Sequence, residues 1–109
     1  MAYFWHAEDR RTVDALPGIR RTLVTAGERV MAVRFELAKG SVLPAHSHPH
    51  EQIGFVASGQ LRFDIAGEAM LLKAGDGYAV PPNAVHSVEV IEDAVAIDVF
   101  TPVRAEYLE

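Results

Sequence analysis

The chain has 109 residues, of which half are apolar and 23% are charged, a composition typical of one globular domain. It contains no cysteine, which excludes disulfides, thiolate zinc sites and cysteine nucleophiles. A formal net charge of -5 argues against nucleic acid as a partner, and the absence of a long apolar run argues against a signal peptide or a membrane span. We therefore expect a single domain over residues 1–109 in a soluble, cytoplasmic protein with no membrane partner.

The first thirty residues carry the weakest signals of the chain. They predict only edge strands and loops, with a turn at Pro17 and Gly18. The pair Arg20/Arg21 is interpreted as solvated surface, because paired charges without a wider pattern usually face water.

Strand signals dominate the rest of the chain. Residues 30–37 and 60–65 alternate apolar and polar side chains, which is the period of a half-buried strand. Turn residues separate such runs at short intervals, in AKGS, ASGQ, IAGE, KAGDG and PPNA. Short strands separated by such turns predict an all-β sandwich or barrel. A turn of helix is expected only near the end, after Thr101 and Pro102.

The histidines are clustered in a way that a metal site would require. His46 and His48 are two apart, so in an extended backbone both imidazoles project from one face and can converge on one ion. This spacing also arises by chance in polar loops. His86 favours the metal site over the polar loop, because it shares one face of a later strand with Val88 and Val90 and is expected to point to the interior as a third ligand.

Asp98 is a second anomaly, because it interrupts a strand that is apolar on both faces. It shares one face with Ala96 and Phe100. A charged group in such a strand must be paired or must line a polar cavity. Arg104 is an available partner, so a buried ion pair that fixes the C-terminal segment is one interpretation and a cavity-lining acid is the other.

Two runs of the sequence resemble the paired motifs of the cupin superfamily. The matching positions are Gly40, His46, His48, Gln52 and Gly59 in the first run, and Gly75, Pro81, Asn83 and His86 in the second. The resemblance implies an all-β, single-domain cupin jelly roll, which is a double-stranded β-helix barrel. It also implies that one divalent transition metal, with nickel, zinc, iron and manganese not distinguished, is held by His46, His48, Gln52 and His86.

Two of these positions depart from the superfamily pattern. Asn83 stands in place of the usual glycine, which is possible because asparagine tolerates left-handed backbone. Gln52 stands in place of glutamate. A neutral amide lowers the hold on the ion but leaves it a stronger Lewis acid, which suits polarising a substrate oxygen better than activating dioxygen.

Across nearly the whole chain, the stretches GIRRTLV, HSHPHEQIGFVASGQLRF, VPPNAVHSV and DVFTPVRAEYL are similar to the pectin-degradation cupins of KdgF type. Those enzymes linearise unsaturated monouronates. The resemblance implies that Asp98, Phe100 and Arg104 are catalytic, that a small acidic sugar is the substrate and that the protein is a homodimer. There are two alternatives. One is a cupin that binds a sugar acid without transforming it, and the other is a metal cupin isomerase or lyase that acts on another acidic metabolite.

Overall fold

The computed structural model describes residues 3–108, which form an antiparallel, eight-stranded β structure with two single-turn 3-10 helices. The elements in chain order are η1 (Ala7–Asp9), β1 (Thr12–Leu16), β2 (Ile19–Ala26), β3 (Met31–Leu37), β4 (Val42–His46), β5 (Glu51–Ile65), β6 (Glu68–Lys73), β7 (Gly77–Val80), β8 (His86–Thr101) and η2 (Ala105–Tyr107). Within residues 3–108, no helix is long and apolar enough to cross a membrane. The predicted all-β class is confirmed.

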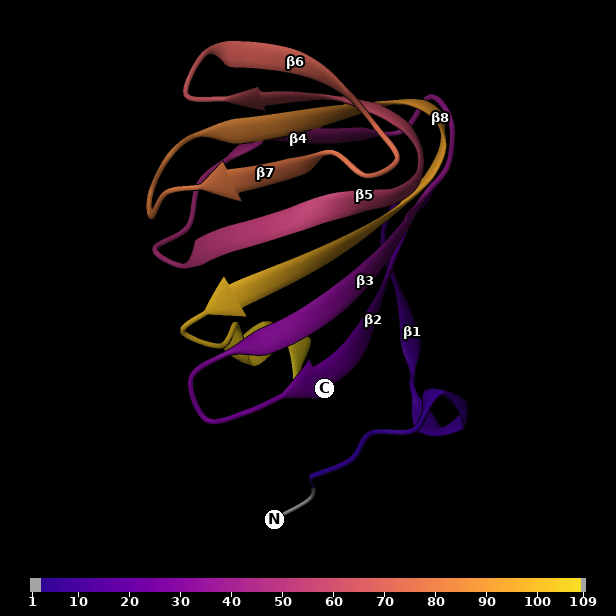
Figure 1. Cartoon of the computed structure of the whole chain (residues 1–109), viewed down its shortest axis with the longest axis vertical. Coiled ribbons are helices and arrows are strands. Elements are labelled where there is room, and N and C mark those ends of the chain that lie inside the picture. Colours follow the sequence, from indigo (N-terminus) through magenta and orange to yellow (C-terminus); the bar gives the residue numbers. More distant parts are fainter. Residues whose placement is uncertain (1–2, 109) are drawn as a thin grey trace.

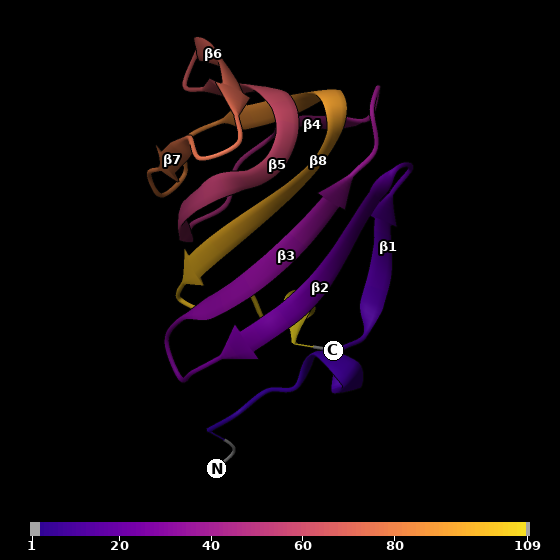
Figure 2. The same ribbon diagram turned by 45° about the vertical axis from the view of Figure 1, so that its right-hand side comes forward.

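The two longest strands, β5 and β8, each contribute to both layers of a barrel (Figure 1). Residues 51–58 of β5 pair with residues 95–101 of β8, and this layer continues through β3, β2 and β1 on one side and β7 on the other. Residues 60–65 of β5 pair with residues 86–92 of β8, flanked by β6 and β4. Figure 2 shows β1, β2, β3 and β8 side by side in the first layer. This is the predicted cupin jelly roll.

Gly59 lies where β5 passes from one layer to the other. Its φ is +83°, and a Cβ there would lie 2.1 Å from the carbonyl oxygen of Asp93 and 2.6 Å from the Cα of Ala94 on β8. The pairing of β5 with β8 shifts register three times between Val56 and Leu61. The prediction of a turn at ASGQ was therefore wrong, and the glycine instead forms a bulge that bends one continuous strand. A turn and a bulge both use a glycine with a positive φ, so the sequence signal for the two is the same.

Other predictions from local pattern are confirmed. Pro17 and Gly18 form the turn between β1 and β2, although β2 proves to be an inner strand of its layer. Residues 31–37 form β3 and residues 60–65 complete β5. Asn83 has a φ of +65°, the left-handed conformation that its side chain tolerates. The helical signal after Pro102 corresponds to η2.

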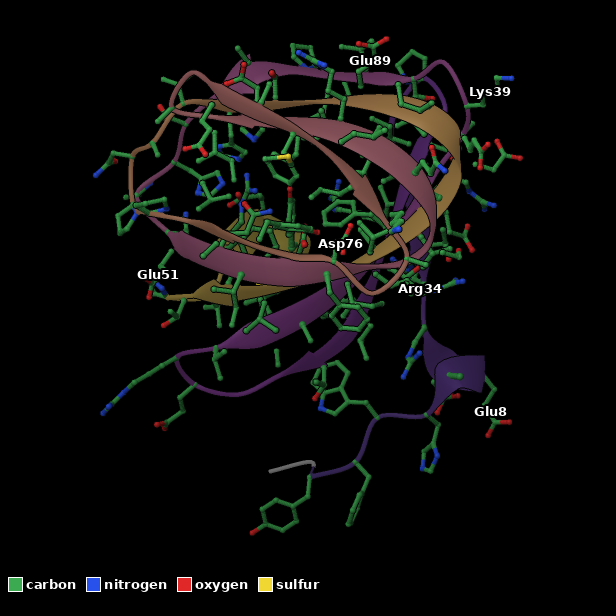
Figure 3. The ribbon with its side chains drawn as sticks, turned by 45° about the horizontal axis from the view of Figure 1, so that its top comes forward. Glu8, Arg34, Lys39, Glu51, Asp76 and Glu89 are labelled. Atoms are coloured by element: carbon green, nitrogen blue, oxygen red, sulfur yellow. The ribbon has the colours of Figure 1, made fainter. Side chains whose placement is uncertain are left out.

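The space between the layers is lined by buried apolar side chains and by a small set of buried polar ones. Figure 3 shows the charged side chains of Glu8, Lys39, Glu51 and Glu89 pointing away from the barrel. Burying a polar side chain costs free energy unless it is paired, so such residues are few. Within residues 3–108 the buried polar side chains are Thr22, His48, Gln52, His86 and Asp98.

Candidate metal centre

Three histidines from both predicted motifs meet inside the barrel. His46 ends β4 and His86 begins β8, and their Cα atoms are partners in the pairing of these strands. His48 lies in the loop from β4 to β5, and its carbonyl oxygen accepts a hydrogen bond of 2.8 Å from the backbone N–H of Asn83. One potential ligand nitrogen from each of the three imidazoles lies within 4.8 Å of those of the other two.

The backbone fixes which ring nitrogen of each histidine is free. Each Nδ1 faces a carbonyl oxygen two residues away in the sequence. The N–O pairs are His46 with Pro44 at 2.9 Å, His48 with His50 at 3.0 Å and His86 with Ala84 at 2.9 Å. Because a carbonyl only accepts, Nδ1 must carry the hydrogen in each case. Each neutral imidazole therefore keeps its lone pair on Nε2, as a metal ligand requires.

Two features of these Nε2 atoms fit a bound cation. The Nε2 of His86 is buried and has no hydrogen-bond partner among residues 3–108. The Nε2 of His48 lies 3.2 Å from the Oε1 of Gln52, so two acceptors face each other. Neither arrangement is favourable in a dry interior by itself, whereas a positive ion between the lone pairs satisfies both.

The orientation of Gln52 is set from its other end. Its amide Nε2 donates a hydrogen bond of 2.9 Å to the Oδ2 of Asp98, which leaves Oε1 directed at His48. A glutamate at this position would set a second carboxylate against Asp98. The structure thus adds a second reason for the departure from the superfamily pattern: the amide is both a possible ligand and the donor that a neighbouring acid needs.

Burial keeps the buried imidazoles neutral. It lowers the pKa of His48 to about 4, with a further contribution from the positive charge of Arg104. Burial also lowers the pKa of His86. The neutral imidazole is the form that binds a metal, so these two side chains would lose no proton on binding one near neutral pH.

Asp98 is 5% exposed and accepts hydrogen bonds at both oxygens, from Gln52 and from the hydroxyl of Tyr78. Burial raises the pKa of this carboxyl to about 7, although the two hydrogen bonds oppose the shift. The interpretation of Asp98 as the buried ion partner of Arg104 was wrong. The Nε of Arg104 lies 2.8 Å from the Oε1 of Glu106 instead, because η2 places that carboxylate closer.

Tyr78 is a residue of this site that the sequence interpretation missed. Tyr78 on β7 and Asp98 on β8 are both register partners of Gly54 on β5, so their side chains meet across the glycine. A Cβ on Gly54 would lie 2.1 Å from the Oδ1 of Asp98 and 2.6 Å from the carbonyl oxygen of Ile97. The available signal was local: Tyr78 shares a strand face with Val80, and an inward tyrosine hydroxyl needs a partner.

A cavity of about 260 Å³ lies between the layers and adjoins the histidines. The polar and aromatic side chains on its wall are Arg21, Phe35, His46, Gln52, Phe63, Tyr78, His86, Asp98, Phe100, Arg104 and Tyr107. His48 adjoins this group through Gln52, and its ring lies 5.9 Å from that of Phe100. The structure therefore brings together all seven residues that the sequence singled out.

The site and the fold have counterparts among known proteins. Residues 33–100 match the cupin domain family. The chain is 40% identical over 93 residues to the pectin degradation protein KdgF of Dickeya dadantii (strain 3937), a match that covers 84% of each protein. The solved structure of KdgF from Halomonas sp. matches with a TM-score of 0.91 at 32% identity, covering 99% of this chain and 100% of that one. The solved structure of an RmlC-like cupin from Shewanella frigidimarina matches with a TM-score of 0.93 at 28% identity, covering 99% of this chain and 97% of that one.

Proposed function

The chain belongs to the cupin family and is a relative of the KdgF proteins, and on this basis we propose that it is a metal-dependent enzyme that linearises Δ4,5-unsaturated uronates from pectin or alginate breakdown. The product is the 4-deoxy-5-keto uronate. One observation supports this most: Gln52 joins a cluster of three metal-competent imidazoles to the buried acid Asp98 within one cavity. A protein that only binds a sugar acid does not need an acid/base group such as Asp98 beside its metal site.

The proposed ligands of one divalent ion are His46, His48, Gln52 and His86. Three imidazoles and an amide oxygen suit nickel, zinc, iron and manganese. When bound, such an ion supplies a Lewis acid that polarises a substrate oxygen.

The remaining chemistry falls to residues of the chain. Linearisation adds a proton to one alkene carbon and the oxygen of water to the neighbouring carbon, which carries the ring oxygen; the resulting hemiketal then opens to the ketone. We assign the proton transfer to Asp98, which faces the cavity. Phe100, 1% exposed, packs against the sugar ring. Arg104 holds the carboxylate of the substrate by charge-assisted hydrogen bonds.

The size of the cavity supports a small substrate. Its 260 Å³ is below the usual range of about 300–1,000 Å³ for pockets that bury drug-sized ligands. A single sugar ring is therefore favoured over an oligosaccharide.

The oligomer, the compartment and the domain limits belong to the same proposal. We propose a cytoplasmic homodimer of single-domain chains over residues 1–109, with no nucleic-acid partner. Ile53 and Phe55 on the outer face of β5 are 52% and 46% exposed, which supports an apolar contact between two copies. Light scattering during size-exclusion chromatography gives the mass in solution; a monomer at all concentrations would rule the dimer out.

The decisive assay uses metal-loaded protein and unsaturated monouronates made by a lyase. We expect the ultraviolet absorbance of the conjugated alkene to disappear and NMR to show the linear ketone. Asp98→Asn should lower turnover by roughly 10² to 10⁴ with little change in metal content. Asp14→Asn, at an exposed site, is the matched control. An alkene that persists with the wild-type protein would favour a binding protein over an enzyme.

A further inference from the structure

Two neighbouring arginines on β2 have different surroundings. Arg20 points outward, where its guanidinium lies 3.3 Å from Asp14 and 3.7 Å from Glu36. Arg21 lies on the opposite face of the strand and lines the cavity that also contains Arg104. The interpretation of both arginines as solvated surface was therefore wrong for Arg21.

Arg21 and Arg104 are held by the same aromatic ring. The guanidinium carbon of Arg21 lies 4.5 Å from the ring centroid of Tyr107, and that of Arg104 lies 4.2 Å from it. Both distances are within the range of a cation–π interaction. Stacking restricts two long side chains before any ligand arrives, which reduces the entropy that binding would cost.

The positive charge of this pair is only partly balanced. The carboxylate of Glu106 is bonded to Arg104, and Arg21 reaches only the backbone carbonyl oxygen of Glu106, at 3.5 Å. Over residues 3–108, no carboxylate lies within 4.0 Å of the guanidinium of Arg21. Among residues 3–108, Glu106 is thus the one carboxylate paired with these two guanidinium groups, since the other acid on the cavity wall, Asp98, accepts its hydrogen bonds from Gln52 and Tyr78. An anionic ligand would complete this arrangement.

We propose that Arg21 is a substrate-binding residue that holds, together with Arg104, the carboxylate of a sugar acid. The inference deepens the proposed function and rests on it. A planar guanidinium presents paired donors that match the two oxygens of a carboxylate. Two such groups make the carboxylate the determinant of specificity, so that neutral sugars of the same size are rejected.

The test measures binding separately from turnover. D-glucuronate, a saturated uronate without the alkene, is titrated calorimetrically into metal-loaded wild-type protein and the Arg21→Ala, Arg21→Lys and Arg20→Ala variants, with D-glucose as the neutral probe. We expect Arg21→Ala to weaken glucuronate binding roughly ten- to hundredfold, as for the loss of a hydrogen bond to a charged group. Arg21→Lys keeps the charge but not the paired donors, so its affinity for glucuronate should lie between those of wild type and Arg21→Ala. The affinity of Arg20→Ala for glucuronate should stay within about threefold of that of wild type.

Steady-state kinetics on unsaturated monouronates and thermal unfolding complete the test. We expect Arg21→Ala to raise KM by a similar factor with kcat nearly unchanged. Unchanged affinity and KM in Arg21→Ala, or a lowered melting temperature without a loss of affinity, would mean that Arg21 only packs against Tyr107, and the inference would be overturned. Glucuronate binding that depends on Arg21 without turnover of unsaturated uronates would support the inference while the proposed reaction failed.

Discussion

Gln52 lies between the lone pair of a histidine and an acid. Its oxygen lies 3.2 Å from the Nε2 of His48, where the two acceptors can share a cation, and its nitrogen donates to Asp98 at 2.9 Å. An amide supplies both a possible ligand oxygen and a hydrogen-bond donor, whereas a carboxylate supplies only the ligand oxygen. The residue that looks like a weakened metal ligand in the sequence is therefore the connection between the ligand cluster and the acid.

Replacing this amide tests the connection. Gln52→Glu should lower the melting temperature of the metal-free protein, because two buried carboxylates then face each other. It should also retain metal more tightly and turn over more slowly, since the added negative charge reduces Lewis acidity. Adding Asp98→Asn supplies an amide donor from the other side and should recover most of the lost stability. A metal-free Gln52→Glu protein that melts like wild type would contradict the assigned orientation of the amide.

Tyr78 acts through Asp98 in this account and is a positioning residue. Tyr78→Phe removes the hydroxyl and leaves one carboxylate oxygen of Asp98 with one donor fewer, a loss of about 1–3 kcal/mol in the free energy of unfolding. We expect kcat to fall while KM and metal content stay near wild type. Tyr3→Phe, at a site that is 80% exposed, is the control. An unchanged kcat would show that the hydroxyl serves packing alone.

At the residue scale, prediction succeeded where the cause is local. The inward direction of His86 follows from the valines on its strand face, and the left-handed backbone of Asn83 follows from its place at a glycine position of the cupin motif. Arg21 was misread because the ring that holds it, Tyr107, lies far along the chain. Of the two interpretations of Asp98, the cavity-lining acid was right, but its partners Gln52 and Tyr78 were not predicted, because three strands converge on its carboxylate and no local pattern shows which side chains they bring.

At the element scale, two glycines determine where β5 bends and how closely side chains of the neighbouring strands approach it. Gly59 bends the strand between the layers, and Gly54 leaves room for a hydrogen bond between residues of its two neighbouring strands. The period of two identified residues 60–65 of β5 as a half-buried strand, and the stretch of β8 around Asp98 was recognised as a strand that is apolar on both faces. Their continuity over 15 and 16 residues was not predicted, because a bulge and a turn share the same residue types.

Gly54→Ala tests the close approach of these strands. The added methyl group would meet the carboxylate of Asp98 and the backbone of Ile97 within 2.6 Å, so we expect a loss of about 1–3 kcal/mol in the free energy of unfolding, together with lower turnover. Gly77→Ala is the matched control, because a Cβ there meets only the carbonyl oxygen of Gly54, at 3.4 Å. Denaturant unfolding measures both variants. Equal stability for the two would refute the steric argument.

At the scale of the whole molecule, the jelly roll places residues of distant sequence around one cavity. The two histidine motifs lie on neighbouring strands of one layer, at the end of β4 and the start of β8, where His46 and His86 are register partners, so the resemblance to the paired cupin motifs was sufficient to predict both the fold and the cluster of three histidines. The spacing does not specify the contents of the cavity wall. Those depend on how β2, β7 and η2 pack against the two motifs.

Metal binding should therefore stabilise the whole barrel. Adding a divalent ion to metal-free protein at a free concentration about 100 times the Kd should raise the free energy of unfolding by about 2.7 kcal/mol. His86→Ala should lose most of this gain, whereas His6→Ala, at an exposed position outside the site, should keep it. Differential scanning calorimetry with and without the ion measures the effect. An equal gain in both variants would place the ion elsewhere.

The most direct test of the account follows turnover of unsaturated monouronates while metal-free protein is titrated with nickel, zinc, iron or manganese in separate experiments. The account predicts that the metal-free protein is inactive and that turnover with at least one of these ions rises until one equivalent is bound per chain. It also predicts that His86→Ala gives no such rise. Full turnover by protein that elemental analysis shows to be free of metal, or undiminished turnover by His86→Ala, would contradict it.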